Sequence, residues 1–137
     1  MGYVLGNKSR RRLYGVHPDL QAVVKKAISI TEQDFSVNEG LRSKQRQQQL
    51  FNTGKSKTLN SRHITGHAVD LLPYPFNGDV DEDGIANIHD WDQYYPIADA
   101  MKQAADELDI PIKWGGDWKS FPDGPHWELP RDKYPNA

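Results

Sequence analysis

The chain contains no cysteine among its 137 residues. No disulfide framework can therefore hold the fold together, and cysteine cannot serve as a nucleophile, a zinc ligand or an iron–sulfur ligand. The fold must depend on a hydrophobic core, for which four Trp, six Tyr and four Phe supply large side chains. Any transition metal must be held by histidine and carboxylate side chains.

The length is typical of one domain, so we expect a single unit over residues 1–137. Lys and Arg number 17 against 19 Asp and Glu, which argues against bulk attraction to nucleic acid or stable insertion into membrane. No apolar run approaches the ~20 residues of a membrane-spanning helix, and the basic start is unlike a signal peptide. We therefore expect a monomer that is made in the cytoplasm without a signal peptide.

Apolar spacing predicts about three helices. The first opens at His17-Pro18-Asp19, the second runs from an N-cap at Ser43 to Gly54, and the third runs from Asp90 to about Asp109. Short strands between turn residues, without regular βαβ alternation, predict an α+β fold with a small antiparallel sheet. The strand candidates are residues 35–39, 68–72, 110–114 and 126–129.

The densest chemical signal lies in two segments, 61–70 and 123–129. His63, Asp70 and His126 would suffice for catalytic zinc, which needs three protein ligands and an open fourth position. Because the first two lie seven residues apart, the chain must bend between them, and the glycine in between supplies a place for the bend. The second histidine would then arrive from a neighbouring strand.

Spacing alone leaves alternatives open. His63 and His67 have the i, i+4 spacing of a helical zinc site, although the helical Glu is missing and a Gly intervenes. The histidines could also be ordinary buried residues while Asp70 caps a turn. In the same way, Asp123 could be a simple turn residue, and Arg42 could be a solvated charge.

The pattern Ser-x-His-x-x-Gly-x-Ala-x-Asp at 61–70, joined to a downstream Asp-Gly-x-His-x-Glu-Leu, resembles the VanY-type D-Ala-D-Ala and L-alanyl-D-glutamate zinc metallopeptidases. That family includes several phage endolysins. The similarity begins at Glu39-Gly-Leu-Arg42-Ser43 and ends at Leu129, so it covers most of the chain. It implies a hedgehog/DD-peptidase-like fold and cleavage of the peptidoglycan stem peptide, between L-Ala and D-Glu, in the periplasm or envelope.

The resemblance also implies residue roles. His63, Asp70 and His126 would bind Zn²⁺, Asp123 would be the general base where many members carry Glu, and Arg42 would bind a substrate carbonyl or carboxylate. Zinc bound to two neutral imidazoles and one carboxylate keeps a positive charge that acidifies water. Glu128, two residues after His126, would lie on the same strand face and could orient the histidine. Further substrate-binding residues are predicted at Ser43, Trp114 and Trp127, with the hydrophobic core as the alternative for the two tryptophans.

An acidic loop at 79–90 has EF-hand calcium spacing, with a glycine at loop position 6. Loop position 12 is Asp rather than Glu, and the proline-containing residues before the loop cannot form a helix that leads into it. The loop is therefore similar to dockerin-type calcium loops. An acidic solvated turn is the alternative. We expect structural or regulatory Ca²⁺, with ligands at Asp79, Asp81, Asp83, Ile85, Asn87 and Asp90.

Two other functions remain open. A D-Ala-D-Ala carboxypeptidase or dipeptidase of the same fold would need a closed pocket for a terminal carboxylate. A non-enzymatic calcium-dependent binding module would retain the fold without catalysis, and the acidic residue at Asp123 argues against it.

Overall fold

The computed structural model describes residues 2–54, 61–74, 92–118 and 123–135. In these ranges the chain forms the predicted α+β fold, with four α-helices rather than three. The α-helices are α1 (Asn7–Arg12), α2 (Pro18–Ile30), α3 (Lys44–Asn52) and α4 (Tyr94–Leu108). The strands are β1 (Phe35–Glu39), β2 (Ala68–Pro73), β3 (Lys113–Trp114) and β4 (His126–Glu128), and a 3₁₀ turn, η1 (Gly115–Asp117), follows β3.

The four strands form one antiparallel sheet in the order β1-β2-β4-β3. Alternate side chains of a strand point to opposite faces, so each strand presents one face to the helices and one to the opposite side. Val69, Leu71 and Trp127 are buried in the hydrophobic core. Asp70 and His126 alternate with these residues and therefore lie on the opposite face of the sheet.

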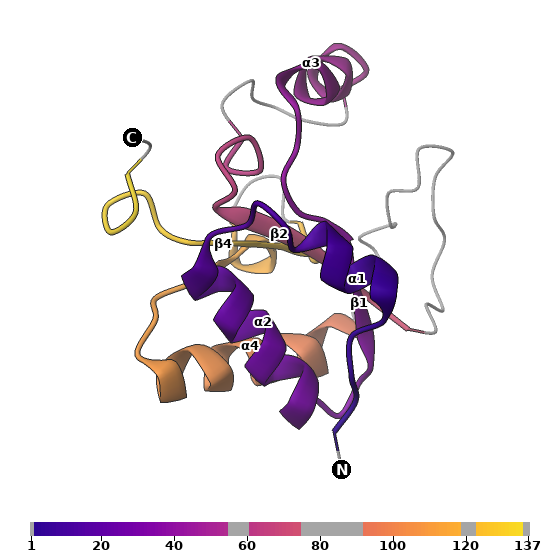
Figure 1. The fold of residues 1–137 in the computed structure, drawn as a ribbon, viewed down its shortest axis with the longest axis vertical. Coiled ribbons are helices and arrows are strands. Elements are labelled where there is room, and N and C mark those ends of the chain that lie inside the picture. The colour runs from indigo at the N-terminus through magenta and orange to yellow at the C-terminus, as the bar shows by residue number, and fades with distance from the viewer. Residues whose placement is uncertain (1, 55–60, 75–91, 119–122, 136–137) are drawn as a thin grey trace.

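Helices α2 and α4 pack against each other and supply much of the core (Figure 1). In α2 the predicted apolar face is buried, with Leu20, Val23 and Val24 fully inaccessible to solvent. The helix begins as the sequence predicts, because the His17 ring accepts a hydrogen bond from the Asp19 N–H at 3.1 Å. In Figure 1, α3 lies on the other side of β2 from α2 and α4.

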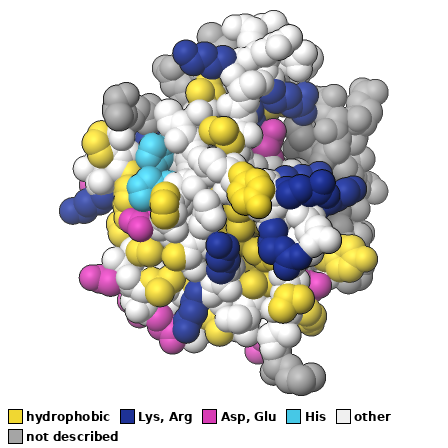
Figure 2. All heavy atoms as spheres, viewed as in Figure 1, with side chains coloured by type: hydrophobic (Ala, Val, Ile, Leu, Met, Phe, Trp, Pro, Cys, Tyr) yellow, Lys and Arg dark blue, Asp and Glu magenta, His cyan; other side chains and the backbone are white. Residues whose placement is uncertain are grey.

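Helix α1 was not predicted, because its sequence has no apolar periodicity and its N-terminus has no side-chain cap. Tertiary contacts with the edge strand β1 hold it in place. The Ser9 hydroxyl accepts a hydrogen bond from the Val37 N–H at 2.9 Å, and Arg12 donates to the Val37 carbonyl at 3.0 Å. These bonds satisfy backbone groups that an edge strand would otherwise expose. Lys and Arg side chains gather over this part of the surface (Figure 2).

Two element boundaries differ from the sequence prediction. The third predicted helix, α4, begins at Tyr94 after Gln93 rather than at Asp90, which lies outside the described residues. The strand predicted over 110–114 shrinks to Lys113–Trp114. The predicted calcium loop at 79–90, with all six of its predicted ligands, also lies outside the described residues. No helix in the described part of the chain has the length and hydropathy needed to span a membrane.

Candidate metal centre

Strand pairing brings two of the three predicted metal ligands together. In the register of β2 and β4, Asp70 lies directly opposite His126. His63 reaches them from the turn before β2, where Gly66 adopts φ +78°. A Cβ atom at Gly66 would lie 2.3 Å from the carbonyl oxygen of Gly15, so the bend requires glycine. The predicted bend is therefore confirmed, and its glycine is also in close backbone contact.

The three side chains have the spacing of a single metal site. One potential ligand atom from each of His63, Asp70 and His126 lies within 4.8 Å of the other two. Asp70 Oδ1 is 3.1 Å from His63 Nε2 and 3.5 Å from His126 Nδ1. Tetrahedral zinc with bonds of about 2.0–2.2 Å separates its ligand atoms by roughly 3.3 Å. These donors therefore match two edges of a zinc tetrahedron.

The outer nitrogen of each histidine faces a hydrogen-bond acceptor. His63 Nδ1 lies 2.8 Å from the Gly40 carbonyl oxygen, and His126 Nε2 lies 2.8 Å from Glu128 Oε1. Each outer nitrogen must therefore carry a proton. In the neutral rings, the inner nitrogens would then direct their lone pairs at the Asp70 carboxylate. A cation or a proton must lie between them, and this requirement fits a metal site better than ordinary buried histidines.

Electrostatics around the cluster support this conclusion. Burial alone would lower the pKa of His126, but hydrogen bonds to Asp70 and Glu128 and the charges of Asp70 and Asp123 raise it to about 9. Burial would raise the pKa of Asp70, but the charge of His63 and hydrogen bonds from both histidines bring it well below its usual range. Positive charge beside the Asp70 carboxylate therefore stabilises its ionised form, and a bound cation could supply that charge.

Asp123 lies beside this cluster at the turn into β4. Its backbone N–H donates to the Gly115 carbonyl at 2.9 Å, and its carbonyl accepts from the His126 N–H at 3.3 Å. Burial, followed by the negative charge of Asp70, raises the pKa of Asp123 to about 6. A carboxyl group with a pKa near neutrality has the proton affinity expected of a general base.

Arg42 is not a solvated charge, because its side chain is only 9% exposed. Its guanidinium donates to Glu39 at 2.9 Å and to Gln47 at 2.6 Å, and it lies 3.6 Å from Asp70 Oδ2. The two oxygens of Asp70 are thus divided, with Oδ1 toward the histidines and Oδ2 toward Arg42. Sequence reasoning did not assign a role to Gln47. Its position on the buried face of α3, beside Leu50, is a signal that could have identified it.

Trp114 and Trp127, predicted to bind substrate, lie in the hydrophobic core, which was the alternative for them. These side chains are 6% and 1% exposed, and their rings stack at 5.6 Å with an interplanar angle of 14°. Trp127 lies between His126 and Glu128 in β4. Because alternate side chains of a strand point to opposite faces, the Trp127 side chain points to the face that the helices cover. Among the described residues, Trp118 is an aromatic side chain at the site, since its ring centroid lies 4.9 Å from that of His126 and it is 36% exposed.

Two further predicted residues have other contacts. The helical pair of His63 and His67 is wrong, because the segment between them forms turns and His67 Nδ1 contacts the Thr65 hydroxyl at 2.7 Å. Ser43 caps α3, since its hydroxyl accepts a hydrogen bond from the Arg46 N–H at 3.0 Å. Its contact with substrate remains a prediction.

The fold and this site define a class of protein. A small α+β domain that brings two imidazoles and a carboxylate together, with a further carboxylate alongside, has the features of a mononuclear metal-dependent hydrolase. The chain belongs to the phage L-alanyl-D-glutamate peptidase family, whose model matches residues 1–132. The resemblance inferred from the 61–70 and 123–129 motifs is thereby confirmed.

Individual relatives agree with the family. The chain is 32% identical over 137 residues to the L-alanyl-D-glutamate peptidase of Escherichia phage T5, with 98% of this chain and 94% of that protein covered. It is 32% identical over 110 residues to the peptidoglycan L-alanyl-D-glutamate endopeptidase CwlK of Bacillus subtilis, of which it spans 60%. The crystal structure of Serratia marcescens L-Ala D-Glu endopeptidase ChiX is similar with a TM-score of 0.82 and 43% identity, covering 96% of this chain and 94% of that one.

Proposed function

We propose that this chain is a zinc-dependent endopeptidase that cuts the bond between L-Ala and D-Glu in the stem peptide of bacterial peptidoglycan. One observation carries the chemistry. The inner nitrogens of two histidines and one Asp70 oxygen converge beside Asp123, while the outer nitrogens are held by other acceptors. The substrate is supported by the relatives, which are named for peptidases of this bond.

The donor set fits zinc, with His63 Nε2, Asp70 Oδ1 and His126 Nδ1 as the ligand atoms. When bound there, zinc would acidify a water molecule and polarise the peptide carbonyl. The residues around the ligands prepare this arrangement. The Gly40 carbonyl and Glu128 fix the histidine rings, and fixed rings keep their inner nitrogens directed at one point.

Asp123 would act as the general base. Its carboxylate would accept a proton from the attacking water as the water oxygen bonds to the carbonyl carbon. When the carbon–nitrogen bond breaks, the same carboxyl group would return the proton to the leaving amine. The raised pKa of Asp123, caused by burial and by Asp70, favours proton acceptance near neutral pH.

Arg42 would serve two purposes. Its contact with Asp70 Oδ2 orients the carboxylate ligand. Of its five N–H groups, three donate to described residues, through Glu39 and Gln47. Nη2 also lies 3.6 Å from Asp70 Oδ2, so one N–H group, on Nη1, has no partner among the described residues. That group could donate to a substrate carbonyl and stabilise developing negative charge.

We extend the proposal to the whole chain as one domain over 1–137, acting as a monomeric phage endolysin on the cell wall. The EF-hand spacing at 79–90 supports a calcium site there, either structural or regulatory. The test is wall lysis at fixed zinc after calcium is stripped, for the native chain and for Asp79→Ala combined with Asp81→Ala. If the site is regulatory, lysis should be slower for the native chain without calcium and for the double variant. Unchanged lysis would leave calcium with at most a structural role.

The cleavage itself is tested by mass spectrometry. Purified peptidoglycan is digested with the zinc-loaded protein, and with an Asp123→Asn variant as the control. We expect new C-terminal L-Ala and new N-terminal D-Glu from the native protein only. Release of terminal D-Ala would assign a carboxypeptidase instead, and intact stem peptides would support a binding module.

A further inference from the structure

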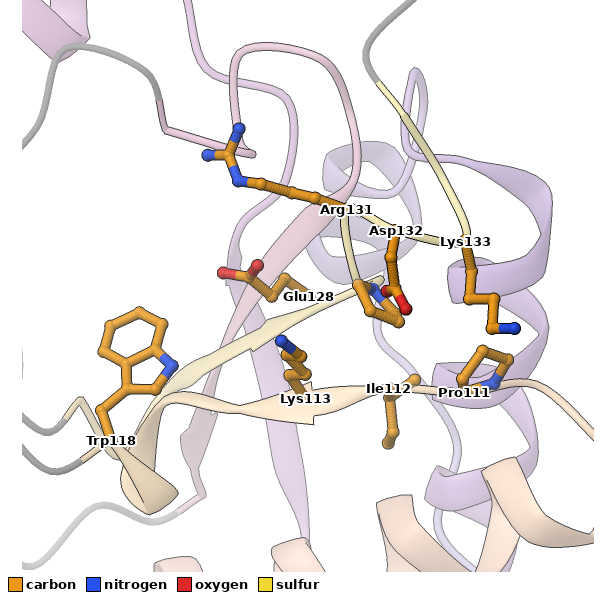
Figure 3. Close-up of a pocket in the computed structure, with 9 residues that line it drawn as sticks. Pro111, Ile112, Lys113, Trp118, Glu128, Arg131, Asp132 and Lys133 are labelled. Atoms are coloured by element: carbon orange, nitrogen blue, oxygen red, sulfur yellow. The ribbon is translucent and has the colours of Figure 1, made fainter.

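A groove with a volume of about 670 Å³ is lined by residues of β3, β4 and the segments that flank them (Figure 3). Trp118 and Glu128 belong both to this groove and to the surroundings of the cluster. The Trp118 ring contacts the His126 ring at 4.9 Å, and Glu128 bonds to His126 Nε2 at 2.8 Å. The groove is therefore adjacent to the cluster of His63, Asp70 and His126, which we call the metal cluster.

Strand register places the groove on the same face of the sheet as the metal cluster. Lys113 on β3 pairs with Glu128 on β4, two residues along the strand from the pair formed by Asp70 and His126. Cross-strand and diagonal neighbours lie roughly 5–8 Å apart, and one extended peptide residue spans about 3.3 Å. A substrate held at the metal would thus reach the groove within one to two residues.

The groove has a small excess of positive charge. Lys113, Arg131 and Lys133 line it together with two carboxylates, Glu128 and Asp132. Figure 3 shows Lys113 and Arg131 on either side of Glu128. The three cations against two carboxylates leave these side chains with a net charge of 3 − 2 = +1, which favours an anion.

We infer that this groove binds the carboxylate-bearing D-glutamyl side of the substrate, the side that leaves as an amine. This inference depends on the proposed function. The D-glutamate that follows the scissile bond carries a free carboxylate, whereas the L-alanine before it carries only a methyl group. The groove's cations therefore complement the leaving side, with Lys113 nearest to the metal cluster along the strand register.

The test compares soluble stem-peptide fragments that carry the D-glutamate carboxylate either free or amidated. The variant is Lys113→Gln with Lys133→Gln, and the matched control is Lys8→Gln with Lys25→Gln, which removes two exposed charges from α1 and α2. With the free carboxylate, we expect KM to rise roughly 5- to 20-fold in the groove variant and to stay native-like in the control. With the amidated fragment, the native KM should already be high, and the groove variant should not change it.

The zinc content of each variant is measured in parallel, because Lys113 neighbours Glu128. Zinc loss in the groove variant would show an effect through the metal centre and would overturn the inference. Equal KM values for the two fragments, or an unchanged KM in the groove variant, would also overturn it while leaving the proposed cleavage intact. If the native protein cuts neither the fragments nor whole peptidoglycan, the proposed function fails and the groove assignment fails with it.

Discussion

Asp70 on β2 and His126 on β4 face each other across an antiparallel strand pair, with Asp70 Oδ1 3.5 Å from His126 Nδ1. This pairing makes the sheet itself part of the candidate metal centre, because backbone hydrogen bonds between the strands set the distance between two of the proposed ligands. Ligands on rigid strands are held more accurately than ligands on loops. The predictions below test the centre that this pairing creates.

Removal of any one metal ligand should abolish zinc retention and peptidoglycan cleavage, because two protein donors are too few to hold zinc. The variants are His63→Ala, Asp70→Ala and His126→Ala. Zinc content is measured on purified protein, and circular dichroism checks the fold. Stoichiometric zinc in all three variants would disprove the assignment.

Glu128→Gln should weaken zinc affinity about 10- to 100-fold, because the amide is a weaker acceptor for the His126 Nε2 proton. A chelator competition measures the affinity. Glu107→Gln is the matched control, since Glu107 forms only a 3.8 Å surface pair with Lys26. Equal zinc affinity in the two variants would remove Glu128 from the centre.

Asp123→Asn should retain zinc and fold while kcat falls by about 10²- to 10⁴-fold, because the amide cannot accept the proton of the attacking water. Turnover of stem-peptide fragments and zinc content are measured together. Near-native turnover would show that Asp123 is only a turn residue.

Gly66→Ala should destabilise the protein more than Gly54→Ala does. Both glycines have positive φ, at +78° and +79°, so the two variants share the same backbone strain. At Gly66 the new Cβ would clash, at 2.3 Å from the Gly15 carbonyl oxygen, whereas no atom of the described residues lies within 4 Å at Gly54. Denaturant unfolding should show a cost of about 1 kcal/mol for Gly54→Ala and several kcal/mol for Gly66→Ala. Similar costs would mean that the bend before β2 relaxes freely.

Tyr134 should make the free energy of unfolding depend on alkaline pH. A hydrogen bond from its hydroxyl to Asp19, helped by burial and by the Asp19 charge, raises the pKa of Tyr134 to about 12. A pKa above the unfolded value of about 10 stabilises the folded state fully below pH 10, and this contribution is lost as pH rises from 10 to 12. Unfolding titrations should therefore show a shallower alkaline loss for Tyr134→Phe than for the native chain. Tyr14→Phe, at a 76% exposed position, should match the native slope.

Local sequence patterns determined several elements of this fold. The apolar spacing of α2 and the Ser43 cap of α3 act over one or two helical turns, so neighbouring residues suffice to predict them. Residue chemistry made His63, Asp70 and His126 candidate metal donors, and the family resemblance selected them over the alternatives. The structure brings one potential ligand atom of each within 4.8 Å of the others.

Only the tertiary structure decided what surrounds those donors. Contacts between distant segments position the Gly40 carbonyl against His63 and the Arg42 guanidinium against Asp70, and no local pattern encodes them. Long-range packing also stabilises α1, whose sequence lacks helical signals, and turns Trp127 into the core. The physical reason is that strand pairing and helix packing set which face each side chain occupies, and these depend on residues far apart in the chain.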